Sequence, residues 1–378
     1  MRFIHLSDLH IGKRVNGYSM LEDQDYILRK ILNIIDEEKP DAIIIAGDVY
    51  DKSSPSDEAV RLFDDFLVRL SKRGKPVFVI SGNHDSAVKL AFASKLIEYS
   101  GVHMSPVYDG NVNKVALKDE FGDVNIYMLP FVKPIHVRSV FPDKEIHDYT
   151  DACRVAVEHM DVDTTKRNII VAHQFVVGAG RCDSEEVSVG GLDSVDGSVF
   201  DDFDYVALGH IHGPQCVERP EVRYCGTPLK YSMSEENHHK SVTVVDIAEK
   251  GNVSVREVEL APLRDMRTIK GSYEEVTRKS FYEGTNTEDY LSVILTDEEE
   301  ITDAINKLKI IYPYIMHLEY DNMRTRENRD VTEAVDVDTK TPLELFEELF
   351  EKQNNQPMNE IQKKYMSDLF EKVMEESV

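Results

Sequence analysis

The chain has 378 residues, of which 41% are hydrophobic and 30% are charged, and its formal net charge is −26 at pH 7. That length accommodates two or three domains of about 100–200 residues each. So acidic a composition argues against an autonomous nucleic-acid-binding protein, because phosphate backbones are bound by Lys and Arg. If the protein acts on DNA, metal ions, local basic loops or a partner must supply the positive field.

Cysteine usage and the length of the apolar runs bear on the cellular compartment. The four cysteines, Cys153, Cys182, Cys216 and Cys225, show no CxxC spacing, so neither a zinc ribbon nor a redox motif is indicated. The N-terminal MRFIHLSDLH has a strand pattern and not that of a secretory signal. The longest apolar runs are strand-sized, far short of the roughly 20 residues that span a bilayer. We therefore expect a reducing, cytoplasmic environment.

Residues 1–260 alternate strand-like apolar runs with helical patterns. Amphipathic stretches at 26–38 and 57–73 separate the first three runs. Strands that alternate with helices predict an α/β layered domain, and the short strands crowded toward its end predict a second sheet. The predicted strands are RFIHLSD, DAIIIAGD, PVFVISGNHD, NIYMLP, NIIVAHQF, YVALGHIH, VRYCG, SVTVVDI and VSVREVEL.

Residues 264–321 form a second predicted unit. RTIKG, YLSVILTD and YIMHLEYD have strand patterns, and the two segments between them, 272–280 and 298–313, have helical ones. This alternation predicts a small, separate β-α-β-α-β domain, to which we assign a capping and DNA-binding role.

The last part of the chain is predicted to be a linker followed by two helices. Residues 322–340 are polar and lack periodicity, which is typical of a linker. Residues 341–378 show two short amphipathic patterns, the first beginning at TPLE with Thr341 as N-cap. Helices this short are marginal in water unless their apolar stripe is buried. We expect them to dock on a partner; a hairpin folded back on the chain's own surface is the alternative.

Polar side chains follow five of the predicted strands at their carboxyl ends. SDLH, GD, GNHD, VAHQ and GHIH each place Asp, Asn or His there, and none places Cys. In α/β sheets the carboxyl ends of the strands are where ligands bind. The residues concerned are Asp8, His10, Asp48, Asn83, His84, His173, His210 and His212.

These residue types are those that two neighbouring divalent ions require, because such a pair needs a bridging carboxylate and mixed nitrogen and oxygen ligands. One site would consist of Asp8, His10, Asp48 and His212, and the other of Asp48, Asn83, His173 and His210. Asp48 is therefore the predicted bridge. His84 remains free to donate a proton to a leaving alkoxide. The ligand types suit Mn²⁺, Fe²⁺ or Zn²⁺ without choosing among them.

The same motifs resemble the calcineurin-like metallophosphoesterase superfamily. HLSDLHIGK, AGDVYDKSSPSDEAV, ISGNHDS, VGGLDSVDGSVFDDFDYVALGHIHGPQ and YCGTPLKYSMSE are similar to the SbcD family, a bacterial nuclease subunit that works with the SMC-like ATPase SbcC. The resemblance covers residues 1 to about 240 strongly. It implies a four-layer α-β-β-α sandwich, followed by the small capping domain and the C-terminal helices.

The resemblance also implies an activity and partners. They are a manganese-dependent 3′-to-5′ exonuclease on double-stranded DNA ends and an endonuclease on single strands and hairpins. The setting would be DNA repair, recombination and replication at the nucleoid, with an SbcC-type ATPase as partner. The family further implies a homodimer through the helices after GDVYD and GNHD, for which Val60, Phe63, Phe66 and Leu67 are the candidate apolar residues.

Basic residues beside the motifs are candidate DNA contacts. They are Lys13 and Arg14, Arg181, and Lys230 with the neighbouring Tyr231. Two other functions stay open at this point: a hydrolase of small phosphodiesters, and a non-catalytic scaffold subunit. The complete ligand set argues against the scaffold, and the extra region 264–378 argues against a stand-alone small hydrolase.

Overall fold

A computed structural model describes residues 1–185 and 193–322, together with residues 343, 346–347, 350, 358, 362–366 and 369. Residues 323–340 of the predicted linker and most of the two predicted C-terminal helices lie outside the described residues. Over the described part of the chain, every helix is too short or too polar to cross a bilayer.

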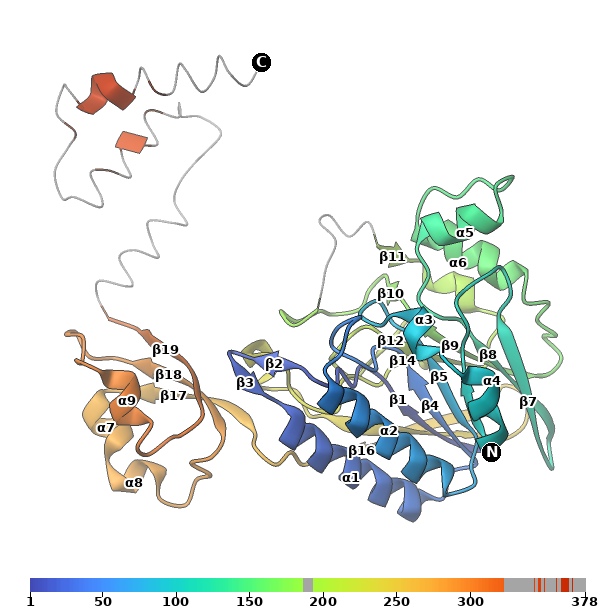
Figure 1. The fold of residues 1–378 in the computed structure, drawn as a ribbon, viewed down its shortest axis with the longest axis horizontal. Coiled ribbons are helices and arrows are strands. Elements are labelled where there is room, and N and C mark those ends of the chain that lie inside the picture. The colour runs from blue at the N-terminus through green and yellow to red at the C-terminus, as the bar shows by residue number, and fades with distance from the viewer. Residues whose placement is uncertain are drawn as a thin grey trace. The chain divides into compact units, whose positions relative to one another are not determined.

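The first sheet contains the strands that carry the first three motifs (Figure 1). Its parallel strands are β1, β4, β5 and β6, and β15 and β16 extend it in antiparallel pairing beside β1. In spatial order the strands are β16 (Val253–Glu259), β15 (Ser241–Ile247), β1 (Arg2–Leu6), β4 (Ala42–Ala46), β5 (Val77–Ile80) and β6 (Val102–Met104).

The second sheet carries the last two motifs. Strands β8, β9, β12 and β14 run parallel, and β7 and β13 pair antiparallel at its two edges. Its spatial order is β13 (Gln215–Val217), β14 (Arg219–Tyr224), β12 (Tyr205–Gly209), β9 (Arg167–His173), β8 (Gly122–Met128) and β7 (Asn113–Asp119). All nine strands expected over residues 1–260 are confirmed.

Alternation along the strands builds the core in layers, because successive strand residues face opposite sides of a sheet. In β4, Ile43 and Ile45 pack on the helices, whereas Ile44 packs between the two sheets. In β9, Ile170 faces the helical side of the second sheet and Ile169 faces the first sheet. Burial on both faces explains why these strands are apolar throughout.

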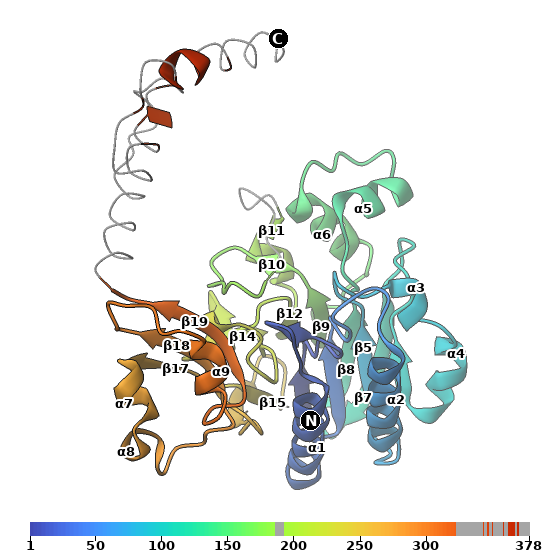
Figure 2. The ribbon, with the colours of Figure 1, turned by 60° about the vertical axis from the view of Figure 1, so that its left-hand side comes forward.

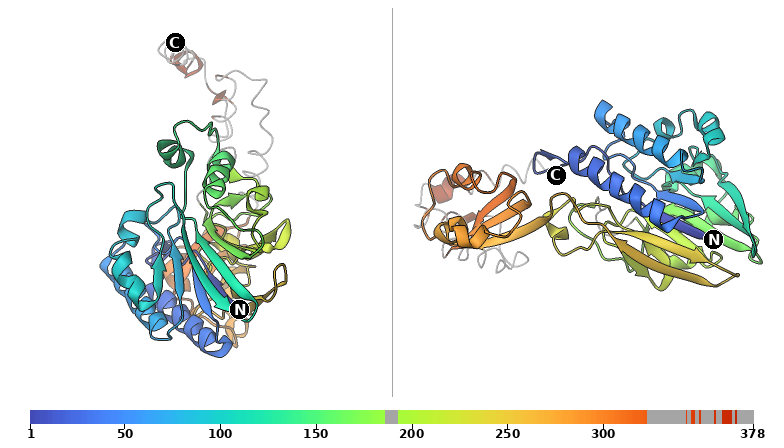
Figure 3. Two further views of the ribbon diagram at one scale, coloured as in Figure 1. Left: turned by 90° about the vertical axis from the view of Figure 1, so that its right-hand side faces the viewer. Right: turned by 90° about the horizontal axis from the view of Figure 1, so that it is seen from below.

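Helices cover the outer face of each sheet (Figures 2 and 3). α1 (Leu21–Glu38) and α2 (Asp57–Ser71) supply the core on the first sheet, and α6 (Tyr149–Glu158) supplies that on the second. Shorter helices are α3 (Ala87–Leu90), α4 (Ser94–Ile97) and α5 (Pro134–Val140). These layers confirm the predicted α-β-β-α sandwich.

Two two-stranded ribbons complete this region: β2 (Arg14–Val15) with β3 (Tyr18–Ser19), and β10 (Phe175–Val176) with β11 (Ser194–Val195). The three strands expected over 264–321 are also confirmed, as a sheet of order β17 (Met266–Gly271), β18 (Tyr290–Leu295) and β19 (Ile315–Tyr320). The accompanying helices are α7 (Tyr273–Thr277), α8 (Lys279–Tyr282) and α9 (Ala304–Leu308).

By contacts between residues the chain divides into two units. The first comprises Met1–Lys270, Glu274–Ile294 and Asp303–Glu319. The second comprises Gly271–Tyr273, Leu295–Thr302 and the chain from Tyr320 onward. Within the second unit, the amide of Tyr273 donates to Asp297 at 2.7 Å and the side chain of Asn322 donates to the Asp297 carbonyl at 3.2 Å.

Candidate metal centre

The loop after β1 carries the first two predicted ligands in an unusual backbone conformation. Asp8 and His10 have φ angles of 51° and 44°, in the left-handed region that non-glycine residues rarely adopt. Their amides donate to the carbonyls of Gly47 and Asp48, both at 3.0 Å, which ties this loop to the loop after β4. Asp48 (φ 47°) and His210 (φ 101°) are also left-handed. Backbone strain of this kind concentrates at functional sites.

Two glycines make room for the ligands. A Cβ on Gly82 would lie 2.1 Å from Asp48 Oδ1, and one on Gly47, at φ +87°, would lie 2.3 Å from His173 Nδ1. The glycine that precedes the ligand in GD, and the one that precedes Asn83 in GNHD, are therefore required for the close approach of the strand ends.

Asp85, the last residue of GNHD, joins two of these loops. Its carboxylate accepts from the amides of Val49 at 3.1 Å, Tyr50 at 3.0 Å and Gly82 at 3.0 Å. Sequence reasoning assigned this residue no role. The position of Asp85 at the end of GNHD does not by itself indicate a role. The three backbone amides that donate to its carboxylate show that it fixes the geometry of the two loops.

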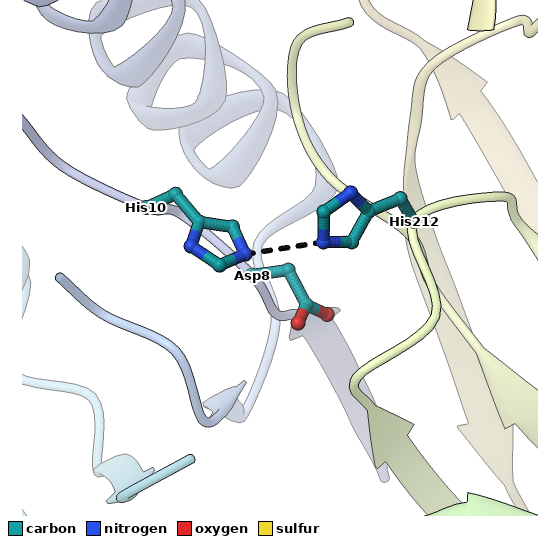
Figure 4. A group of neighbouring side chains, drawn as sticks. All are labelled: Asp8, His10 and His212. Atoms are coloured by element: carbon teal, nitrogen blue, oxygen red, sulfur yellow. Dashed lines mark hydrogen bonds between the residues drawn. The ribbon is translucent and has the colours of Figure 1, made fainter. Parts of the chain in front are cut away.

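The eight predicted site residues come together in one place. Their polar atoms form a continuous series of contacts of 3.0–3.9 Å, from His212 through His10, Asp48 and His173 to Asn83 and His210, with His84 and Asp8 at its sides. Figure 4 shows one end of this series, where Asp8 lies beside His10 and His212, whose Nε2 atoms are 3.1 Å apart. Three of the four candidate cation-binding groups in the described residues belong to this series: Asp8 with His10 and His212, Asp8 with Asp48 and His173, and His10 with Asp48 and His84; the fourth is Cys182 with His212 and Glu235.

Asp48 lies between His10, from one predicted ligand set, and His173, from the other. Its Oδ2 is 3.7 Å from His10 Nε2 and 3.3 Å from His173 Nε2, and it is 2% exposed. Burial would raise the pKa of Asp48, but His173 and His10 oppose this effect and hold the pKa below its usual range. Asp48 is thus a buried carboxylate placed between the two predicted ligand sets.

Burial shifts the pKa values of most other groups of the centre in favour of their neutral forms. Burial raises the pKa of Asp8 to about 6 and lowers that of His210 to about 3. Burial also lowers the pKa of His10 well below its usual value. The pKa of His173 is raised to about 9, because the carboxylates of Asp48 and Asp8 outweigh the effect of its burial. Burial thus disfavours the charged forms of Asp8, His10 and His210, whereas the two carboxylates favour the charged form of His173.

Hydrogen bonds to the outer nitrogens orient two histidines inward. His173 Nδ1 is 2.8 Å from the Ala46 carbonyl, an acceptor only, so Nδ1 carries a proton and Nε2 faces the centre. Ser184 Oγ donates to Glu235 Oε1 at 2.5 Å and therefore accepts from His212 Nδ1 at 2.6 Å. The Nε2 atom of His212 is thereby left with a lone pair that points at His10.

The centre fits the cations that its sequence implies. Imidazole, carboxylate and amide oxygen donors without thiolates suit Mn²⁺, Fe²⁺ or Zn²⁺. The Nε2 atoms of His10 and His212 lie 3.1 Å apart, and His10 Nε2 lies 3.7 Å from the buried Asp48 carboxylate. Burying several imidazole nitrogens and carboxylates together is costly, and a bound cation would offset that cost.

His84 differs from the other histidines of the centre. Its side chain is 13% exposed, and its Nδ1 donates to the Asp51 carbonyl at 3.0 Å. This bond leaves Nε2 available to a bound molecule. The backbone amide of His84 donates to Asp48 Oδ1 at 2.9 Å, a contact that does not depend on the imidazole.

The predicted DNA contacts differ in their exposure and in their ion-pair partners. Arg14 is exposed, and Arg181 lies over the ring of Phe175 at 3.5 Å with its guanidinium 3.7 Å from an Asp193 carboxylate oxygen. Lys13 and Lys230 are paired with Asp51 at 2.9 Å and Asp265 at 2.7 Å. The expectation for Tyr231 was wrong: it is 3% exposed and its hydroxyl bonds internally to Leu9 and Gln24, so it cannot touch DNA.

The candidate apolar face of α2 also needs correction. Phe63 and Phe66 are 3% and 2% exposed and belong to the chain's own core, so they cannot form an interface. Val60 is 44% exposed, as expected. The exposed apolar residues near it, which sequence reasoning missed, lie in and around α3 and α4: Val88, Phe92, Leu96 and Tyr99, exposed by 71%, 80%, 74% and 92%.

Family models match both parts of the chain. The model described as calcineurin-like phosphoesterase matches residues 1–214, and the one described as type 5 capsule protein repressor C-terminal domain matches residues 262–354.

Curated relatives match over nearly the full length. The D subunit of the SbcCD nuclease from Staphylococcus epidermidis is 34% identical over 366 residues, which are 96% of each chain. The protein of the same name from Staphylococcus saprophyticus is 33% identical over 352 residues, which are 92% of each chain.

Solved structures give a fainter likeness. A dimetal phosphatase from Danio rerio shares 12% identity at a TM-score of 0.39, covering 69% of this chain and 99% of that one. The protein TT1561 of Thermus thermophilus shares 12% identity at a TM-score of 0.37, covering 68% and 98%.

Proposed function

Because the chain belongs to the SbcD family of calcineurin-like phosphoesterases, which makes it a metal-dependent nuclease subunit, we propose that it is a two-metal DNA nuclease of DNA end processing, repair and recombination. Its activities are a 3′-to-5′ exonuclease on double-stranded ends and an endonuclease on single strands and hairpins. The observation that carries the proposal is the convergence of Asp, Asn and His from five strand ends around Asp48.

The chain's own residues fall into two ligand sets. Asp8, His10, Asp48 and His212 would hold one ion, and Asp48, Asn83, His173 and His210 the other. When bound, a pair of divalent ions supplies positive charge that offsets the charge developing on a phosphodiester in the transition state. Mn²⁺ is the proposed metal.

His84 is the proposed proton donor. The Asp51 carbonyl accepts from Nδ1 and fixes the imidazole with Nε2 turned toward the centre, so that the imidazolium form would give its Nε2 proton to the leaving oxygen. Arg14 and Arg181 are the proposed contacts to the DNA backbone, with Lys13 and Lys230 available where a phosphate displaces their carboxylate partners.

One assay separates this function from a small-phosphodiester hydrolase. The purified chain is given Mn²⁺ with a 5′-labelled duplex, a labelled hairpin and, in parallel, a chromogenic phosphodiester. We expect cleavage of both DNA substrates, abolished by EDTA and restored by Mn²⁺. Turnover of the chromogenic ester with neither DNA cleaved would favour the small-molecule hydrolase, and no turnover of any substrate would favour a scaffold subunit.

The C-terminal segment 341–378 is the proposed dock for an SbcC-type ATPase. The name of the curated relatives, a subunit of a complex, supports such a partner, and an amphipathic helix laid on a partner is a recurrent mode of recognition. We expect deletion of residues 341–378 to leave Mn²⁺-dependent cleavage of single-stranded DNA nearly intact and to abolish co-purification with the ATPase. Unchanged binding by the truncated chain, or joint loss of solubility and metal, would contradict this role.

The exposed apolar residues after β5 are the proposed homodimer face. Exposed apolar surface of this kind marks an interaction site, and Phe92 lines a groove with Val60 and Leu67 of α2. We expect light scattering to give twice the 43.2 kDa chain mass for the wild type and the single mass for Phe92→Asp. Ile310→Asp is the control, because Ile310 is equally exposed, at 85%, and outside this face. A dimeric Phe92→Asp protein would rule the face out.

A further inference from the structure

The loop after β1 places His10 at the metal centre in a strained backbone conformation, which other contacts must stabilise. Asp8, His10 and Gly12 all have positive φ angles within five residues. The backbone bonds from this loop to the loop after β4 fix its inner side. Its outer side is held by two side chains from elsewhere in the chain, Gln24 and Tyr231.

Gln24, near the start of α1, spans the loop with one amide group. Its Oε1 accepts from the Gly12 amide at 2.9 Å, and its Nε2 donates to the His10 carbonyl at 2.8 Å and to the Tyr231 hydroxyl at 3.0 Å. The side chain is 1% exposed, so water does not replace any of these bonds. Both amide hydrogens and the oxygen are used, which fixes the amide in one orientation.

Tyr231, 207 residues after Gln24 in the sequence, is the second side chain that holds this loop. Its hydroxyl donates to the Leu9 carbonyl at 2.6 Å while it accepts from Gln24. Its ring stands edge-on to the rings of His10, at 5.8 Å between centroids, and of His212, at 6.4 Å. One side chain thus contacts two predicted ligands that are some 200 residues apart in sequence and whose Nε2 atoms are 3.1 Å apart.

These contacts are confined to one half of the centre. In residues 1–185 and 193–322, no hydrogen bond or ring contact joins Gln24 or Tyr231 to Asn83, His173 or His210. His173 is oriented instead by the Ala46 carbonyl. Substitution of Gln24 or Tyr231 should therefore change metal binding by the ligand set that contains His10 and His212.

We propose that Gln24 and Tyr231 are positioning residues that set the metal affinity of the His10–His212 half of the centre. They preorganise His10 through its own backbone and restrain both rings, so that the ligands do not have to be ordered when the ion binds. Groups that orient a metal ligand commonly change affinity by about 10–100-fold when removed. This inference rests on the proposed ligand sets.

The test is a Mn²⁺ titration of the metal-free protein, followed by electron paramagnetic resonance, with Tyr231→Phe and Gln24→Met. Tyr231→Phe removes one oxygen and keeps the ring. We expect the first equivalent of Mn²⁺ to bind as in the wild type, with the signal of an isolated ion. The spin-coupled signal of two neighbouring ions should then require about 10–100-fold more Mn²⁺.

Tyr312→Phe is the matched control. Tyr312 is 1% exposed and its hydroxyl also donates to a backbone carbonyl, that of Val276, at 2.7 Å. The Tyr312→Phe protein should lose about as much thermal stability as the Tyr231→Phe protein and should keep wild-type Mn²⁺ binding. This comparison separates positioning from the general cost of deleting a buried hydrogen bond.

Three results would overturn the inference: wild-type titrations in both variants, equal weakening of both ions, or equal weakening in Tyr312→Phe. Failure of both variants to fold, judged by circular dichroism, would also overturn it, because the pair would then serve the core and not the site. A wild-type chain that binds fewer than two Mn²⁺ ions contradicts the proposed centre itself, and the two failures are therefore distinguishable.

Discussion

Asp48→Ala should abolish Mn²⁺-dependent DNA cleavage, and millimolar Mn²⁺ should not restore it. The carboxylate contacts His10 at 3.7 Å and His173 at 3.3 Å, so its removal takes a ligand from both proposed sites at once. It also leaves the buried imidazole of His173, whose pKa the Asp48 carboxylate raises, without its main counter-charge. We expect a loss larger than the roughly 10²–10⁴-fold typical of a missing general acid, together with loss of both metals by elemental analysis.

His10→Ala is the matched comparison, because it removes a ligand from one proposed site only. Its activity should be partly rescued as Mn²⁺ is raised, since mass action can refill a weakened site. Asp48→Asn adds a second comparison: it keeps an oxygen to accept from the His84 amide and loses the charge. Equal rescue of Asp48→Ala and His10→Ala would remove Asp48 from the bridging role.

His84→Ala should keep both metals and lose turnover by about 10²–10⁴-fold. The imidazole is not needed to complete either ligand set, and the backbone amide of residue 84 still bonds to Asp48 after the substitution. What disappears is the imidazole that the Asp51 carbonyl orients through Nδ1, and with it the Nε2 proton of the imidazolium form. The measurements are single-turnover cleavage of a labelled duplex and metal content by elemental analysis.

His317→Ala controls for the general effect of losing a histidine, because His317 is 55% exposed and belongs to no ligand set. It should behave as the wild type in both measurements. A His84→Ala protein that cleaves at the wild-type rate is incompatible with proton donation. One that lacks metal would make His84 a ligand, in keeping with its grouping beside His10 and Asp48.

The sequence by itself determined the strands and the residues that follow them. Runs such as AIIIA and IIVA are apolar at every position because both of their faces are buried, and that pattern is local. Parallel strands deliver their carboxyl ends to one edge of a sheet, so the order of the motifs alone was enough to group Asp8, Asp48 and Asn83. The twelve confirmed strands and the grouping of these three residues follow from these local rules, whereas His173, His210 and His212 approach them only because the second sheet packs on the first.

Only the tertiary structure decided which side chains face that edge and which stand behind it. Tyr231 follows a basic residue in a polar segment and resembles a surface tyrosine, yet it is buried against Leu9, 222 residues away in sequence. Phe63 and Phe66 lie on the apolar stripe of α2 and turn into the chain's own core, while Phe92, in a short irregular segment, stays exposed. Helical periodicity gives the apolar face of a helix but not what covers it, because the covering surface comes from residues distant in the chain. For the same reason the hydrogen bonds of Gln24, Asp85 and Ser184, which orient the loops and ligands, leave no pattern in the sequence.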